Sequence, residues 1–161
     1  MHPRCARDTA EDLEEVRLMI DVGEHEIARD ELRWLLTDCP ENMGAHVLLG
    51  DLAAEAGDFS LARGHYGAGY QLGLQTLRRA KMPKPLLYSQ PANRAFFEAG
   101  RGLIGSLERL GTNAMADEVL ATLMELDSSD PLRLRAMVDA LRTGGAPIVS
   151  LEYPRNSDEH A

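Results

Sequence analysis

The chain has 161 residues, which is enough for one domain with a sizeable core. Apolar residues make up 44% of the chain and aromatic residues only 5%, a composition that suits closely packed helices better than a β-sheet. The formal net charge is −9, and no part of the chain carries the clustered lysine and arginine that binding to a nucleic-acid backbone requires. We therefore expect an all-α protein that does not bind nucleic acid.

The first residues and the cysteines indicate a cellular compartment. Residues 1–10 contain no apolar core of signal-peptide length, and no stretch of the chain approaches a membrane span. Cys5 and Cys39 are the two cysteines, and they stand in different local contexts, so a pair of reduced thiols is expected. These features predict a cytoplasmic protein without membrane association.

Two helices are predicted in the first part of the chain. Residues 1–8 show no hydrophobic periodicity and are expected to be flexible. Thr9, with an acid three residues later, can cap a helix whose apolar residues recur to Val22, after which Gly23 ends it. A second helix over residues 24–37 carries its apolar residues on one side, and a proline follows soon after its end.

Two more helices follow, and the second of them is unusually long. Asn42 can cap a helix over residues 43–56, and Asp58 can cap a helix over residues 59–80. Several glycines fall inside this long helix, and each costs about 1 kcal/mol relative to alanine. Either they allow a close approach to a neighbouring helix, or the helix breaks between Gly67 and Gly73.

A proline-rich stretch interrupts the helical pattern. Residues 81–92, KMPKPLLYSQPA, contain three prolines and cannot form an ordinary helix. They account for most of an insertion over about residues 77–92, and an insertion of this length in a compact helical array is more often functional than idle. A helix over residues 91–110 follows, then Gly111 and a further helix to Leu126.

The last predicted helix lacks a partner. Ser129 and Asp130 precede Pro131, a residue that suits the first position of a helix over residues 132–142. A lone helix at the end of a helical array is expected to act as its cap. Residues 143–161 are expected to form a flexible or extended tail.

The helical pairs repeat at a fixed offset. Gly23 and Gly57 are 34 residues apart, and an alanine and a large apolar residue follow each of them, and Gly111, at the same two distances. This pattern over residues 9–142 resembles the tetratricopeptide repeat (TPR) family, and the segment YSQPANRAFF is similar to one in some bacterial TPR proteins. The sequence departs from the family pattern at Asp12, His46 and Gly100, where aromatic residues are usual.

The resemblance implies a right-handed superhelix of about three helical hairpins whose first helices line a concave, peptide-binding face. By alignment with the family, the face includes Arg17, Asp21, Asp51, Glu55, Glu98 and Arg101. Arg94 is expected to reach toward it from beside the insertion. Arg17 and Arg101 are candidate contacts for an anion, but the asparagines of the family's carboxylate-binding variant are missing, so that variant is rejected.

No constellation in the sequence indicates catalysis, a metal or a cofactor. The five histidines show no metal-ligand spacing, and no His-x-x-x-His or Cys-x-x-Cys pair occurs. The glycine-rich run from Gly64 to Gly73 follows no strand, so it does not form a phosphate-binding loop. We therefore expect a protein that is not an enzyme.

Trp34 falls off the apolar stripe of its helix, toward the outer surface. It can pack under the N-terminal segment or contact a partner or a second subunit. The leading hypothesis is a protein-interaction module that binds a peptide or an extended segment of a partner protein. The alternatives are a three-repeat secretion-type chaperone and a structural unit that forms homodimers through Trp34 or through the last helix.

Overall fold

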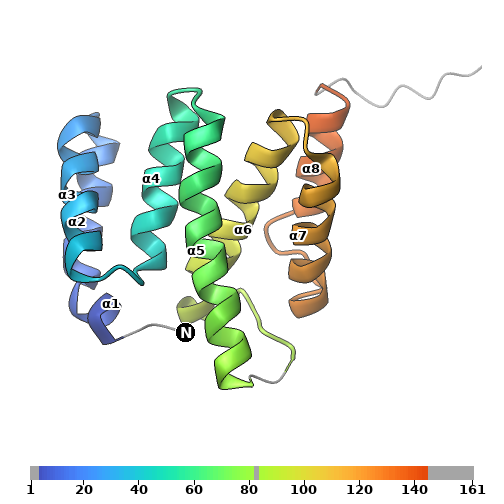
Figure 1. Ribbon diagram of the computed structural model, residues 1–161, viewed down its shortest axis with the longest axis horizontal. Coiled ribbons are helices and arrows are strands. Elements are labelled where there is room, and N and C mark those ends of the chain that lie inside the picture. Colours follow the sequence, from blue (N-terminus) through green and yellow to red (C-terminus); the bar gives the residue numbers. More distant parts are fainter. Residues whose placement is uncertain (1–3, 82–83, 145–161) are drawn as a thin grey trace, which may run out of the picture.

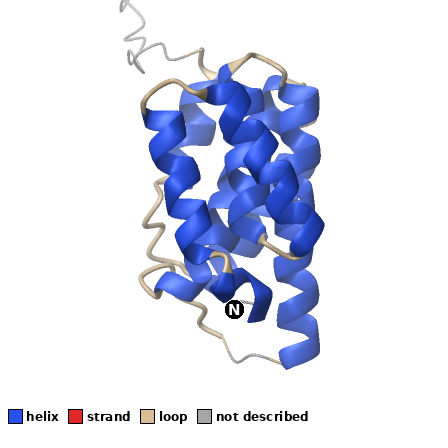
Figure 2. Ribbon diagram, turned by 90° about the vertical axis from the view of Figure 1, so that its left-hand side faces the viewer, coloured by secondary structure: helices blue, strands red, loops and turns tan. Residues whose placement is uncertain are grey.

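The computed structural model describes residues 4–81 and 84–144, and within these ranges the chain forms eight helices and no strand (Figures 1 and 2). The expected all-α fold class is confirmed. The helices are α1 (Arg4–Asp8), α2 (Ala10–Asp21), α3 (His25–Asp38), α4 (Met43–Glu55), α5 (Phe59–Ala80), α6 (Pro91–Arg109), α7 (Asn113–Leu126) and α8 (Leu134–Arg142). The predictions for residues 1–3 and for most of the tail lie outside the described residues.

The helices α2 to α7 form three consecutive hairpins that stand side by side, and α8 follows the last of them (Figure 1). The three hairpins turn in the same way, at Gly23, Gly57 and Gly111, whose φ angles are 86°, 78° and 77°. L side chains rarely adopt such angles, so each turn requires glycine. The residue after each glycine donates its N–H to the carbonyl five residues earlier, at 2.9 Å in all three turns.

Two of the predicted helix caps are confirmed. Asn42 accepts a hydrogen bond from the Ala45 amide at 3.1 Å, and Asp58 accepts one from the Leu61 amide at 3.0 Å. The expected cap at Thr9 is wrong. Its hydroxyl instead donates to the Cys5 carbonyl at 3.0 Å, because residues 4–8 form the short helix α1 where no regular structure was expected.

The start of α8 differs from the prediction by two residues. The helix begins at Leu134, after a turn in which Arg133 has a φ of 54°. The Asp130 carboxylate caps the helix by accepting hydrogen bonds from the amides of Leu134 and Arg135, at 2.7 and 3.2 Å. Pro131 therefore lies in the turn and not in the first turn of the helix, because the side chain of Asp130 reaches past it to the amides of the helix start.

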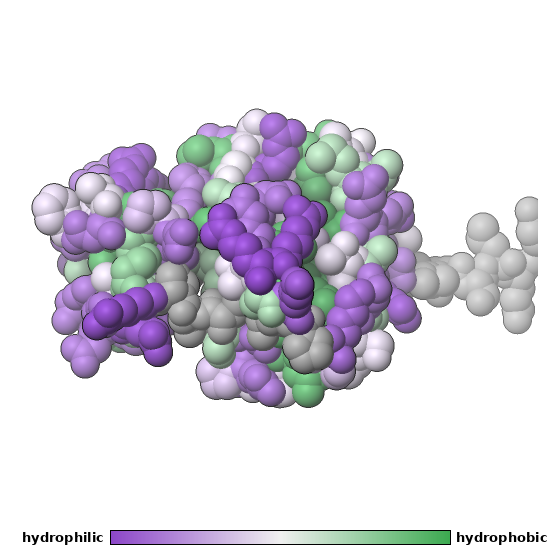
Figure 3. All heavy atoms as spheres, turned by 60° about the horizontal axis from the view of Figure 1, so that its bottom comes forward, coloured by the Kyte–Doolittle hydropathy of each residue, from purple (hydrophilic) through white to green (hydrophobic). Residues whose placement is uncertain are grey.

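The long helix α5 is unbroken, so the alternative of a break between Gly67 and Gly73 is wrong. Two of its glycines, Gly69 and Gly73, permit close packing against α6. A Cβ atom on Gly73 would lie 2.1 Å from the ring of Phe96, and one on Gly69 would lie 3.3 Å from the Ala99 Cβ atom. At the far end of α5, Arg78 and Arg79 are exposed in the last turn. Figure 3 shows the bottom of the molecule turned toward the viewer, where strongly hydrophilic side chains lie at the centre of the surface.

The proline-rich loop after α5 is anchored to the end of α7. The Leu86 amide donates to the Leu126 carbonyl at 3.0 Å, and the Tyr88 amide donates to Asp127 Oδ2 at the same distance. Leu86 is buried in the core. The Asp127 pKa is lowered, first by the hydrogen bond that Ser129 donates to its carboxylate. The predicted insertion over residues 77–92 is thus too wide, because residues 77–80 belong to α5 and residues 91–92 begin α6, while residues 84–90 form a loop attached to the core.

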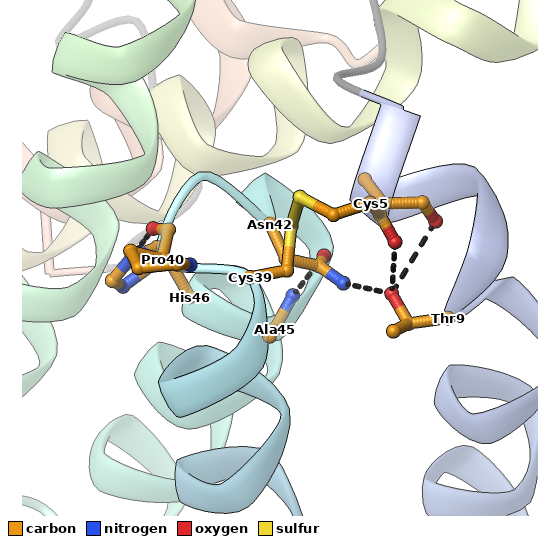
Figure 4. Close-up of a disulfide and its surroundings, with 8 residues drawn as sticks. Cys5, Thr9, Cys39, Pro40, Asn42, Ala45 and His46 are labelled. Atoms are coloured by element: carbon orange, nitrogen blue, oxygen red, sulfur yellow. Dashed lines mark hydrogen bonds between the residues drawn. A yellow bond between two sulfur atoms is a disulfide. The ribbon is translucent and has the colours of Figure 1, made fainter.

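Cys5 and Cys39 form a disulfide, with their Cα atoms 5.6 Å apart, so the expectation of two reduced thiols is wrong (Figure 4). Helix α1 brings Cys5 to the end of α3, an approach that a separation of 34 residues in the sequence does not reveal. Cytosolic reductants keep most thiols reduced. The disulfide thus removes one of the arguments for a cytoplasmic location. Within the described residues no helix has both the length and the apolar character needed to cross a membrane.

Candidate functional site

A groove with a volume of about 910 Å³ runs across the first helices of the hairpins, α2, α4 and α6. Helix α1 contributes to it at one end, α8 at the other, and Tyr88 of the proline-rich loop lies along it. In Figure 1 the second helices of the hairpins, α3, α5 and α7, face the viewer, so the groove opens on the far side. Both the loop and the terminal helices therefore shape the same concave surface.

Five of the predicted site residues line this groove together: Arg17, Asp51, Arg94, Glu98 and Arg101. Asp21 and Glu55 do not line it, because each is the last residue of its helix and lies beyond the groove. Glu55 instead lies 4.0 Å from the ring of His25 on α3. The face given by the family alignment thus coincides with the groove over the middle of each first helix and extends about one turn beyond it.

Tyr66 is the central residue that sequence reasoning missed. It belongs to α5, a second helix, yet its ring passes between α4 and α6 into the groove. Two glycines leave room for it: a Cβ atom on Gly50 would lie 2.5 Å from the ring, and one on Gly102 would lie 2.3 Å from it. The signal in the sequence was the tyrosine at a repeat position that carries leucine in the other two hairpins.

The Tyr66 hydroxyl donates a hydrogen bond of 2.5 Å to Asp51 Oδ1. Burial raises the pKa of the Asp51 carboxyl, against the opposing effects of the Tyr66 hydrogen bond and of the charges on Arg101 and Arg17. Burial and the same hydrogen bond raise the pKa of the Tyr66 hydroxyl. Asp51 remains exposed in the groove, so its carboxylate is accessible to a ligand.

Replacing Gly102 with alanine is expected to lower the free energy of unfolding by about 1–3 kcal/mol. The added methyl group would overlap the Tyr66 ring, which cannot move aside because Gly50 confines its other face. Urea denaturation measures the change. Gly64→Ala on α5 is the matched control, since no atom lies within 4 Å of its added Cβ, and it should stabilise the protein or leave it unchanged. Equal effects of the two substitutions would contradict this packing.

Glu98 and Tyr88 form a second polar group in the groove. The Tyr88 hydroxyl donates to Glu98 Oε1 at 3.4 Å, and the Arg94 guanidinium lies 5.8 Å from the centre of the Tyr88 ring. Burial raises the pKa of the Glu98 carboxyl, and the nearby charge of Arg17 opposes this shift. The proline-rich loop therefore places the Tyr88 ring beside the carboxylate of Glu98. Arg94, one turn earlier on α6, lies over the same ring.

The charged side chains that line the groove are mostly basic, although the whole chain has a net charge of −9. Five arginines line it, against three acidic side chains. Arg17 forms an ion pair with Glu14 on the same helix, and the Arg109 guanidinium lies 4.8 Å from the centre of the Phe59 ring. Among the described residues, no carboxylate lies within salt-bridge distance of Arg101 or Arg109. Their guanidinium groups are thus able to bind an anionic or carbonyl group.

The described ranges hold no cluster of three or more histidine, cysteine, aspartate or glutamate side chains that could bind a metal ion. The nearest approach to a site is His46 beside His65, with ring centres 6.5 Å apart. His46 Nε2 lies 3.2 Å from the Pro40 carbonyl, and its Nδ1 is buried without a hydrogen-bond partner in the described structure.

The two histidines should make the protein less stable in acid. Burial lowers the pKa of both below the ordinary value of 6.5, and for His65 the charges of His46 and Arg33 add to the effect. The unfolded chain then binds more protons, so their contribution to stability is complete above pH 6.5 and decreases as the pH falls below it. Urea denaturation at about pH 7.5 and about pH 5.5 measures the loss. The double variant His46→Gln, His65→Gln should show a smaller loss, and an equal loss would contradict the assignment.

Trp34 does not pack beneath another segment within the described structure, because 65% of it is exposed. Ile27, two turns earlier on α3, is 54% exposed. Within the described residues, the expected packing of Trp34 beneath the N-terminal segment is therefore wrong.

No protein-family model, curated protein or solved structure matches this chain. The similarity to the tetratricopeptide family therefore rests on the repeat in the sequence and on the shared turn geometry of the three hairpins.

Proposed function

We propose that this chain is a tetratricopeptide-like interaction module, a right-handed superhelix without catalytic activity, that binds an extended segment of a partner protein in its groove. Two features support the proposal. The three hairpins share one glycine turn with the same hydrogen bond, as a repeat requires, and their first helices line one concave surface.

The observation that carries the proposal is the mixture of side chains at the centre of the groove. An extended segment has backbone N–H and C=O groups that lack partners of their own. The carboxylates of Asp51 and Glu98 can accept hydrogen bonds from the N–H groups of the segment. The guanidinium groups of the groove can donate hydrogen bonds to its carbonyl or carboxylate oxygens; they belong to Arg17, Arg94 and Arg101. A groove that offers both hydrogen-bond donors and acceptors suits such a backbone better than it suits a small apolar ligand.

Selection from a random peptide library on the folded, oxidised protein tests this proposal. The double variant Arg17→Ala, Arg101→Ala should weaken the binding of the selected peptides about tenfold or more, since a hydrogen bond to a charged group contributes about 1.5–3 kcal/mol. Arg63→Ala is the matched control, because Arg63 is exposed on α5 and does not line the groove. Failure to enrich any peptide, or binding that survives the double substitution, would contradict the proposed site.

A second candidate function is self-association through α3, and the exposure of Trp34 and Ile27 on one face of that helix favours it. Sedimentation of the wild type and of Trp34→Ala distinguishes the two. A homodimer that becomes a monomer in the variant would support this candidate, and a wild-type monomer at all concentrations would exclude it. The secretion-type chaperone has no observation of its own in its favour.

A further inference from the structure

The short helix α1 has little to hold it in place except the disulfide. It comprises five residues and buries none of them. Isolated helices shorter than about 12–15 residues are marginal in water. Besides the disulfide, α1 is connected to α2 through Thr9, whose amide and hydroxyl both donate to the Cys5 carbonyl, at 3.1 and 3.0 Å. The Asn42 side chain does donate to the Thr9 hydroxyl at 3.1 Å, but this contact lies after the end of α1.

The disulfide joins α1 to a well-buried point of the fold. Cys39 is 0% exposed and follows α3 directly, whereas Cys5 is only half-buried. Figure 4 shows the bond linking α1 to the turn between α3 and α4, beside the Asn42 cap. The disulfide thus ties α1 to the buried end of α3, while the other end of α1 continues into α2 through Thr9.

Helix α1 also forms one end of the groove. Ala6 and Arg7 line it, while Arg4, on the same helix, does not. Arg7 is exposed and makes no ion pair with the described residues. The Arg7 side chain therefore lines the groove only while the disulfide keeps α1 in this position.

We infer that the Cys5–Cys39 disulfide is a redox-sensitive clamp that completes the groove, and that Arg7 is a binding residue only in the oxidised chain. This inference rests on the proposed function of the groove. In the oxidised protein, the bound segment reaches Arg7 and places an acidic side chain or a carbonyl oxygen against its guanidinium. After reduction, α1 leaves the end of the groove and this contact is lost, while the contacts with α2, α4 and α6 remain.

A dithiol reductant can open the clamp. One of its thiolates attacks the sulfur of Cys5, the more exposed cysteine, and Cys39 leaves as a thiolate that takes up a proton. The second thiol of the reductant then attacks the mixed disulfide and releases Cys5 as a thiol. The reductant becomes a cyclic disulfide, so two electrons and two protons pass to the protein.

The test measures the affinity of a selected peptide for oxidised and reduced protein. Reduction with dithiothreitol should weaken binding about tenfold or more, as expected for the loss of one charged hydrogen bond. Arg7→Ala should weaken binding by the same factor in the oxidised protein, and reduction should then have no further effect. Arg4→Ala is the matched control and should bind like the wild type. Cys5→Ser, which keeps the buried Cys39, should bind like the reduced wild type.

Hydrogen exchange distinguishes a local movement of α1 after reduction from unfolding of the whole domain. After reduction the amides of residues 5–9 should exchange as in an unstructured chain, while those of α2 to α7 stay protected, although less strongly, because reduction also lowers the free energy of unfolding. Loss of all protection in α2 to α7 would show that reduction unfolds the domain, and would overturn the inference. Equal binding in both redox states would overturn it and leave the proposed function intact. If no peptide binds in either state, the proposed function fails and the inference about Arg7 fails with it.

Discussion

Replacing Phe96 with alanine should lower the free energy of unfolding by about 3–5 kcal/mol. Phe96 is 0% exposed and lies in the larger of two apolar clusters, which joins α4 to α8. Its ring stacks on Tyr70 with the ring centres 5.3 Å apart, and it meets the edge of Phe97 at 5.7 Å. The backbone of Gly73 packs closely against it, so neighbouring side chains cannot readily fill the cavity that the substitution leaves.

Urea denaturation measures the loss, and Phe59→Ala is the matched control. Phe59 is only half-buried, with the Arg109 guanidinium over its ring, so its removal should cost less than half as much. A domain of this size has a free energy of unfolding of about 5–15 kcal/mol, so the Phe96 variant should still be folded in dilute buffer, with little stability left if the wild type lies at the low end of that range. A loss below about 1 kcal/mol would mean that Phe96 is not at the centre of the core.

Reducing the disulfide should lower the free energy of unfolding by about 4 kcal/mol. The bond closes a loop of 34 residues, and the unfolded chain regains the entropy of that loop when the bond opens. Urea denaturation with and without dithiothreitol measures the difference. The Cys5→Ser variant should unfold at the same urea concentration in both buffers, near that of the reduced wild type. An equal free energy of unfolding of the wild type in both buffers would contradict the predicted stabilisation by the disulfide.

Most of the helical framework could be predicted from the sequence, because the signals that define it are local. Gly23, Gly57 and Gly111 end their helices through positive φ angles, and the side chains of Asn42 and Asp58 satisfy the first amides of theirs. Helix α1 was missed for a physical reason. A helix of five residues has no periodicity to detect, and it is held by a bond to a residue far along the chain.

The candidate site could be predicted in part. The alignment with the TPR family placed Arg17, Asp51 and Arg101 on one face, and the structure brings them together in the groove. Tyr66 could not be found in this way, because it belongs to a second helix and reaches the groove between two glycines of neighbouring first helices. That arrangement depends on how α4, α5 and α6 pack, which spacing within one helix does not reveal.

Photocrosslinking tests most directly whether the groove is the binding surface. A photoreactive amino acid is placed at Ala10, which is exposed and lines the groove, and in a second protein at Trp34 on the outer surface. Each protein is irradiated with a peptide selected on the wild type, and the crosslinked products are identified by mass spectrometry. We expect the peptide to be captured from position 10 and not from position 34. Capture from position 34 alone would contradict the assignment of the groove as the binding site.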